Sequence, residues 1–104
     1  MWETTPAFDA DVRRLTPAER DLFRAAVRGR FAPAAVRVAA DATARWPKAL
    51  RVKAVAGATG IWEMTWSFAG PDGRATFEWI EIGGERAIRW RRIGGHEIFR
   101  DPAR

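Results

Sequence analysis

The stretch "LRVKAVAGATGIWEMTWSF", residues 50–68, marks the point at which the apolar pattern of the chain changes. Before Pro47, apolar residues recur every three or four positions, which is typical of helices packed on a core. In this stretch Trp62, Met64 and Trp66 alternate with polar residues, which is typical of a strand with one buried face. The glycine-bearing segment "AGATG" indicates a turn between two antiparallel strands. The sequence therefore predicts helices followed by an antiparallel sheet.

The alternation continues through "RATFEWIEI", residues 74–82, and "RAIRWRR", residues 86–92, with glycine-bearing turns between the runs. Each predicted strand has one apolar face that helices can cover. The residues expected to point inward are Trp62, Met64, Trp66, Phe77, Trp79 and Trp90. The opposite face collects Arg51, Lys53, Glu63, Thr65, Arg74, Thr76, Glu78, Arg89 and Arg91. We expect this second face to be open, polar and mostly basic, although a charged sheet face is also what solvent exposure alone produces.

The N-terminal part of the chain carries two helix-start signals. Thr5-Pro6 has the form of an N-cap followed by proline, and "TPAE", residues 16–19, has the form of a capping box. "MWET" before them is short enough to be an edge strand. Gly29 and Pro33 are expected to limit the second helix, and residues 34–45 to form a further short helix.

Length and composition predict one soluble domain over residues 1–104. The fold class is α+β, with N-terminal helices packed on one face of a four- to five-stranded, mainly antiparallel sheet. Cysteine is absent, so disulfides, thiolate metal sites and cysteine nucleophiles are excluded. The sequence has no apolar run of membrane-spanning length and no signal-peptide pattern, so a cytoplasmic location is expected. No metal or other cofactor is expected.

The formal net charge is +5, and much of the excess lies near the C-terminus. Residues 86–104 contain six arginines against Glu97 and Asp101. A clustered basic excess favours a polyanionic partner, either nucleic acid or an acidic protein. The competing interpretation is compositional, because sixteen of the eighteen basic residues are arginine and alanine is abundant.

The only histidine, His96, follows two glycines at the end of this arginine-rich strand. Imidazole and guanidinium groups suit RNA cleavage, in which the 2′ hydroxyl attacks its own phosphate. Such cleavage needs a base, an acid and cations that hold the phosphorane charge, but no metal ion. The version that uses two histidines is excluded. The competing interpretation is a surface histidine at a strand exit.

Three stretches resemble toxins of the RelE/ParE superfamily, which belong to type II toxin–antitoxin systems. They are "TPAFDADVRRL" at residues 5–15, "LRVKAVAGATGIWEMTW" at residues 50–66 and "RRIGGHEIF" at residues 91–99. The resemblance implies a RelE-like fold and an endoribonuclease that cleaves mRNA on the ribosome. It also implies a cognate antitoxin protein as partner, with no membrane contact.

The resemblance also assigns roles to single residues. It makes His96 the acid or base and Arg92 a catalytic residue that binds phosphate. Strand parity places Arg92 on the core side unless the strand bulges or ends there, so Arg91 is the alternative. The RNA-binding residues implied are Arg51, Lys53, Arg74 and Phe99.

The sequence leaves open the role of Glu63 and the choice between three functions. Glu63 matches a carboxylate that is the base in some relatives, but pairing with Lys53 is the slightly preferred interpretation. The chain has no tyrosine, so a C-terminal tyrosine cannot contribute to catalysis here. The alternative functions are a ParE-like inhibitor of DNA gyrase and a non-catalytic domain that binds an antitoxin or RNA.

Overall fold

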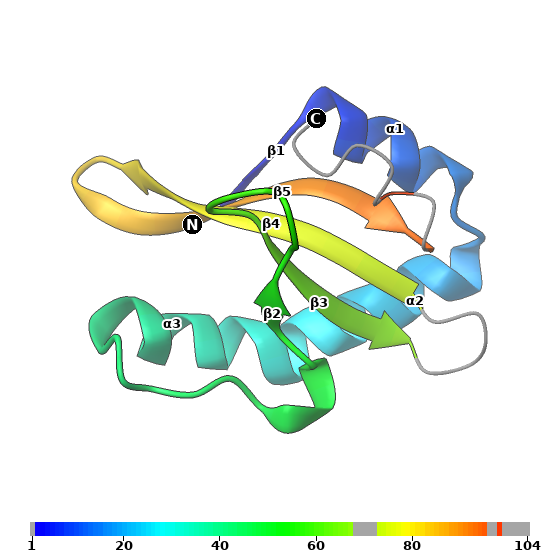
Figure 1. The fold of residues 1–104 in the computed structure, drawn as a ribbon. Helices are drawn as coiled ribbons and strands as arrows, with labels where there is room; N and C mark the ends of the chain where they lie inside the picture. Colours follow the sequence, from blue (N-terminus) through cyan, green and yellow to red (C-terminus); the bar gives the residue numbers. More distant parts are fainter. Residues whose placement is uncertain (1, 68–72, 96–97, 99–104) are drawn as a thin grey trace.

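The computed structural model describes residues 2–67, 73–95 and 98 and has the expected α+β architecture. A five-stranded mixed sheet with strand order β1-β5-β4-β3-β2 packs against the helices (Figure 1). The strands are β1 (Trp2–Thr4), β2 (Lys53–Ala54), β3 (Trp62–Ser67), β4 (Gly73–Ile82) and β5 (Glu85–Gly94). The helices are α1 (Pro6–Arg14), α2 (Pro17–Ala26) and α3 (Ala32–Ala40), with a π turn at Val27–Phe31 and a 3₁₀ turn at Lys48–Leu50. In this described part of the chain, no helix combines the length and apolar composition needed to cross a bilayer.

Both predicted helix starts are confirmed by their capping hydrogen bonds. The Thr5 hydroxyl accepts a bond from the Phe8 amide at 3.1 Å. Thr16 and Glu19 form the reciprocal capping box, with each side chain accepting from the other's backbone amide. These caps satisfy amides that have no partner within a helix, so the two starts are determined locally.

The helix break expected at Gly29 and Pro33 does not occur. The π turn Val27–Phe31 joins α2 directly to α3, and the Ala32 amide donates to the Val27 carbonyl. Proline cannot donate a backbone hydrogen bond, but Pro33 lies in the first turn of α3, where this loss is tolerated. The third helix therefore starts at Ala32 and ends at Ala40, short of residue 45.

Strand parity correctly places most of the aromatic core. Met64, Trp66, Phe77 and Trp90 are buried, and Trp79 is partly buried against the same cluster. Phe31 from the helical layer contacts Phe77 and Trp90 with ring centroids 5.1 and 4.8 Å apart. The inward prediction is wrong for Trp62, which is 36% exposed. Trp62 is paired with Ala54 in the two-residue edge strand, where few neighbours can cover a large ring.

The alternating segment "LRVKAV" forms much less strand than its pattern suggests. Lys48–Leu50 is a 3₁₀ turn, and only Lys53–Ala54 pairs with β3. Arg51 between them has a left-handed backbone, with φ 48° and ψ 44°. Extended pairing cannot pass through a left-handed residue, so β2 begins only after it.

The sheet is mixed because its first strand runs parallel to its last. β1 pairs with β5 in the register Trp2↔Ile88 and Thr4↔Trp90, which confirms the predicted N-terminal edge strand. The remaining pairings are antiparallel. The β4–β5 hairpin turns at Gly83 and Gly84, both with positive φ, as a type I′ turn requires.

Candidate functional site

The polar face of the sheet is more enclosed than the sequence pattern predicts. Glu63, Thr65 and Thr76 are only 8%, 1% and 0% exposed, so the expectation of an open face is wrong for them. Thr65 is paired with Arg74, and Thr76 with Arg92. Each threonine thus has a long arginine as its cross-strand neighbour, and periodicity within one strand does not reveal this pairing.

A three-residue charge cluster crosses strands β2, β3 and β4. Lys53 Nζ and Arg74 Nε lie 3.9 and 3.7 Å from the same oxygen of Glu63, Oε1. The Arg74 and Glu63 side chains are each 11% exposed, whereas Lys53 is largely solvated. The Lys53–Glu63 pairing favoured from the sequence is therefore present. Arg74 is a second cation on the same carboxylate.

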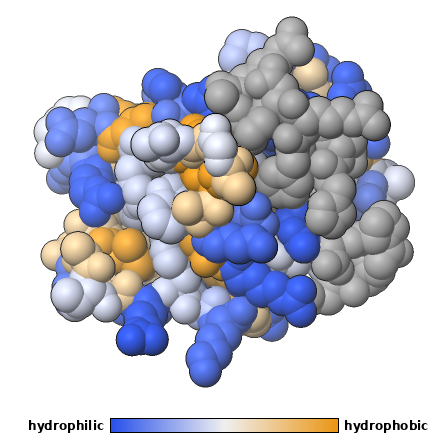
Figure 2. Space-filling model, viewed as in Figure 1, coloured by the Kyte–Doolittle hydropathy of each residue, from blue (hydrophilic) through white to orange (hydrophobic). Residues whose placement is uncertain are grey.

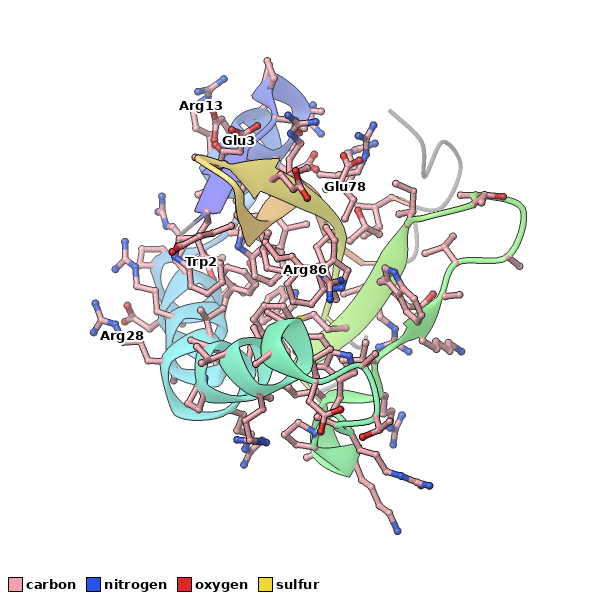
Figure 3. All side chains as sticks on the ribbon, turned by 90° about the vertical axis from the view of Figure 1, so that its left-hand side faces the viewer. Trp2, Glu3, Arg13, Arg28, Glu78 and Arg86 are labelled. Carbon is pink, nitrogen blue, oxygen red and sulfur yellow. The ribbon has the colours of Figure 1, made fainter. Side chains whose placement is uncertain are left out.

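A second charge cluster lies on β1, β4 and β5. Arg91 Nη1 donates a hydrogen bond to Glu78 Oε2, and Arg89 lies 3.8 Å from the same oxygen. Arg89 also binds Glu3 Oε1 through Nη2 at 2.6 Å and Nε at 2.7 Å. The hydrogen bond to Glu3 raises the pKa of Arg89. Figure 3 shows Glu3 and Glu78 on the side of the sheet away from α2 and α3.

A β-bulge decides the position of Arg91 and Arg92. Thr76 is paired with Arg92 and Phe77 with Trp90, which leaves Arg91 as the extra residue of β5. A bulge reverses the side-chain parity of the residues after it. Arg92 thereby leaves the core face, to which simple alternation would assign it, and Ile93 becomes a core residue at 2% exposure.

Helix α1 holds both sides of this bulge. Asp11, which is 4% exposed, accepts from Arg92 Nε at 2.6 Å, from Arg92 Nη2 at 3.1 Å and from the Ile93 amide at 3.1 Å. The Thr5 hydroxyl donates to the Arg91 carbonyl at 2.7 Å, and the Thr5 amide to the Trp90 carbonyl at 3.0 Å. The guanidinium of Arg92 is thus bound at two atoms by a buried carboxylate.

The structure gathers some of the predicted residues and separates others. Lys53 and Arg74 share Glu63, whereas Arg91 and Arg92 bind different carboxylates. Arg51 lies in the turn that precedes β2. His96 and Phe99 lie outside the described residues.

Sequence reasoning missed the partner Asp11 and a basic hollow beside Trp46. Asp11 lies among Phe8, Val12 and Leu15, so the sequence feature that could have indicated its role is an acid within the apolar stripe of a helix.

The hollow has a volume of about 420 Å³ and is lined by Ala44, Arg45, Trp46, Pro47, Lys48, Arg51 and Val52. The sequence feature that could have indicated this hollow is the run of cations without an acidic residue between Asp41 and Glu63.

Comparison with known proteins adds no relative on which to base an assignment. No protein-family model, curated protein or solved structure matches this chain.

Proposed function

We propose that this protein is the toxin of a type II toxin–antitoxin pair and a metal-independent endoribonuclease. Its substrate in this proposal is mRNA, cleaved on the ribosome in the cytoplasm. Its activity is held in check by a cognate antitoxin. The proposal joins the sequence resemblance to the arrangement of charges on the sheet.

The observation that carries the proposal is the Lys53–Glu63–Arg74 cluster. It places two cations and one carboxylate within 4 Å on the polar face of adjacent strands. Arg74 is also the register partner of Gly94, and His96 follows Gly94 by two residues in the sequence. Cationic, carboxylate and imidazole groups are what transesterification of RNA requires.

In the proposed reaction the 2′ oxygen attacks the adjacent phosphorus, and the bond from phosphorus to the 5′ oxygen breaks. A base takes the 2′ proton, and an acid gives a proton to the leaving 5′ oxygen, so a cyclic phosphate and a free 5′ hydroxyl result. His96 provides one of these proton transfers in the proposal, and Glu63 of the cluster is the candidate for the other. Arg74 and Lys53 hold the negative charge that develops on the phosphate oxygens.

The geometry favours Arg91 over Arg92 as a further phosphate ligand. Arg92 is bound at two nitrogens by Asp11, which also accepts from the Ile93 amide. To bind phosphate, Arg92 would have to leave a buried carboxylate, and stranding a buried charge is costly. Arg91 contacts Glu78, which is less deeply buried than Asp11.

A cell-free translation reaction tests the proposal directly. The purified protein is added, and the 5′ ends of the mRNA are mapped with and without active ribosomes. New ends in the coding region, absent with His96→Gln, are the expected result. Gyrase cleavage complexes on DNA with intact mRNA would instead support the ParE-like alternative. Intact mRNA and DNA would support the non-catalytic one.

A further inference from the structure

The turn between α3 and β2 carries an unusual concentration of positive charge. Between Asp41 and Glu63 the sequence has no acidic residue, but it has four cations: Arg45, Lys48, Arg51 and Lys53. In Figure 1 this turn lies on the side of the molecule opposite α1. Figure 2 shows hydrophilic side chains projecting from the same end. The concentration of charge is therefore on the surface and away from the bulge.

The cations surround a hollow with an apolar wall. Arg45, Lys48 and Arg51 line the hollow of about 420 Å³ together with Trp46, and no acidic residue lines it. The indole of Trp46 is stacked on Phe31, with centroids 4.9 Å apart and planes 23° apart. A ring held this firmly offers a preformed apolar surface beside the positive charges.

Two cations of the hollow, Arg45 and Lys48, differ from the cations of the strands because no carboxylate of the described residues lies within 4 Å of them. Lys53, Arg74, Arg91 and Arg92 each lie within 4 Å of a carboxylate. Within the described part of the chain, Arg45 and Lys48 form no such ion pair, and both are exposed. The nearest preceding acid, Asp41, accepts bonds from Thr43 instead, which lowers the pKa of Asp41.

This difference decides which cations can accept a phosphate with little rearrangement. A strand cation must give up or share its carboxylate, whereas an exposed cation releases only its loosely held counterions. The Arg51 amide donates to the Lys48 carbonyl at 3.1 Å, which closes the turn with both residues on the rim of the hollow. The left-handed backbone of Arg51 is part of the same turn.

We infer that this hollow is a binding site for one nucleotide of single-stranded RNA. The phosphate lies among Arg45, Lys48 and Arg51, and the base rests against Trp46. The inference deepens the proposed function, on which it rests for the identity of the substrate as RNA. From β2, which follows the hollow, two strand spacings lead to Arg74 on β4, about 10 Å away. In this inference the RNA strand runs from the hollow around the β2 edge of the sheet to the Lys53–Glu63–Arg74 cluster.

Single-stranded RNA fits these features better than duplex DNA does. A flexible strand can turn an unstacked base into a concave site and stack it on an aromatic ring. A duplex keeps its bases paired and presents only its backbone to such a hollow. Trp46 would then have no role in binding.

Binding of a fluorescently labelled RNA oligonucleotide to the full chain tests the inference. The hollow variant combines Arg45→Ala, Lys48→Ala and Arg51→Gly. Glycine adopts the left-handed backbone of Arg51 without strain, and the melting temperature of the variant is measured beside that of the parent as a control for folding. We expect the dissociation constant to rise at least tenfold and the slope of log affinity against log salt to fall by about 0.7, since the three substitutions remove the contact with one phosphate.

A matched control removes the same amount of charge elsewhere. Arg13→Ala, Arg28→Ala and Arg30→Ala change exposed helical residues, two of which point away from the body of the protein in Figure 3. We expect this control to weaken binding less than threefold. Equal losses in both variants, no loss in either, or a preference for duplex DNA would each overturn the inference.

Competition distinguishes a nucleotide site from a simple anion site. We expect adenosine monophosphate to displace the labelled RNA at concentrations where inorganic phosphate does not. Equal competition by the two would overturn the role of Trp46. RNA binding that depends on the hollow, in a protein that leaves mRNA intact in translation extract, would reject the nuclease and retain this site.

Discussion

Asp11 is the residue whose loss should damage the protein most directly. Its buried carboxylate binds the Arg92 side chain and the Ile93 amide, and it also lies 3.5 Å from Arg14 Nη1. Removing one member of a buried ion pair leaves the other charge without compensation, which typically costs about 3–5 kcal/mol. We therefore expect Asp11→Ala to lower the free energy of unfolding by about 3 kcal/mol in urea titrations.

Asp9 provides the control for this prediction. It is an exposed acid in the first turn of the same helix, so Asp9→Ala should cost less than about 1 kcal/mol, mainly through the helix dipole. Arg92→Met in the Asp11→Ala background should recover part of the lost stability, because it removes the stranded charge. Equal effects of the two aspartate substitutions would contradict the structural role assigned to Asp11.

His96 carries the prediction about catalysis. If it transfers a proton in the proposed reaction, His96→Gln should slow mRNA cleavage by about 10²–10⁴-fold, the usual effect of losing a general acid or base. Rates of appearance of cleaved ends in translation extract measure this effect. A melting temperature of the His96→Gln variant equal to that of the parent would show that the fold is intact. Undiminished cleavage would remove His96 from the mechanism.

Alanine substitutions of Arg91 and Arg92 should have different effects on mRNA cleavage and on stability. Arg91→Ala is expected to reduce cleavage more than stability, because its partner Glu78 remains partly solvated. Arg92→Ala is expected to reduce stability more than cleavage, because it leaves the buried Asp11 carboxylate with only the exposed Arg14, 3.5 Å away, as a cation. The reverse pattern would return the catalytic role to Arg92.

At the level of elements, replacing either of two glycines by alanine is expected to change the free energy of unfolding in opposite directions. A Cβ on Gly73 at the start of β4 would lie 2.5 Å from the Trp66 ring, whose Nε1 donates to the Arg74 carbonyl at 3.0 Å. Gly29 lies in the π turn between α2 and α3, and a Cβ there would meet nothing within 4 Å. The same substitution by alanine therefore tests strand packing in one place and helix propensity in the other.

We expect Gly73→Ala to lower the free energy of unfolding by about 1–3 kcal/mol, as forced overpacking does. Gly29→Ala should raise it by about 0.5–1 kcal/mol, because alanine has less backbone freedom to lose. Chemical denaturation of both variants beside the parent measures the difference. Stabilisation by Gly73→Ala would mean that Trp66 does not occupy the position described.

At the level of the whole molecule, the proposal predicts toxicity and its neutralisation. Expression of the chain alone should arrest bacterial growth, and His96→Gln should abolish the arrest at equal protein level. An acidic antitoxin that covers the basic surfaces would suppress the arrest, as segments that fold on binding often do. Normal growth with abundant, folded parent protein would argue strongly against a toxin.

Features that depend on neighbours along the chain could be predicted from the sequence alone. The change of period after Pro47 predicted helices followed by a sheet, and the Thr5 and Thr16 caps located the first two helices. Alternation in β3 to β5 placed Met64 and Phe77 in the core. These features are local, because each follows from side-chain spacing or from a hydrogen bond within one turn.

Features that depend on partners distant in sequence became visible in the three-dimensional structure. The bulge at Arg91 exists because β4 and β5 pair on both sides of it while α1 binds it through Thr5 and Asp11. The same pairing brings Arg74 to Glu63 and turns an expected open basic face into a set of ion pairs. One extra residue in a strand reverses the parity of every residue after it, and no periodicity within a single strand can reveal a register set by its neighbours.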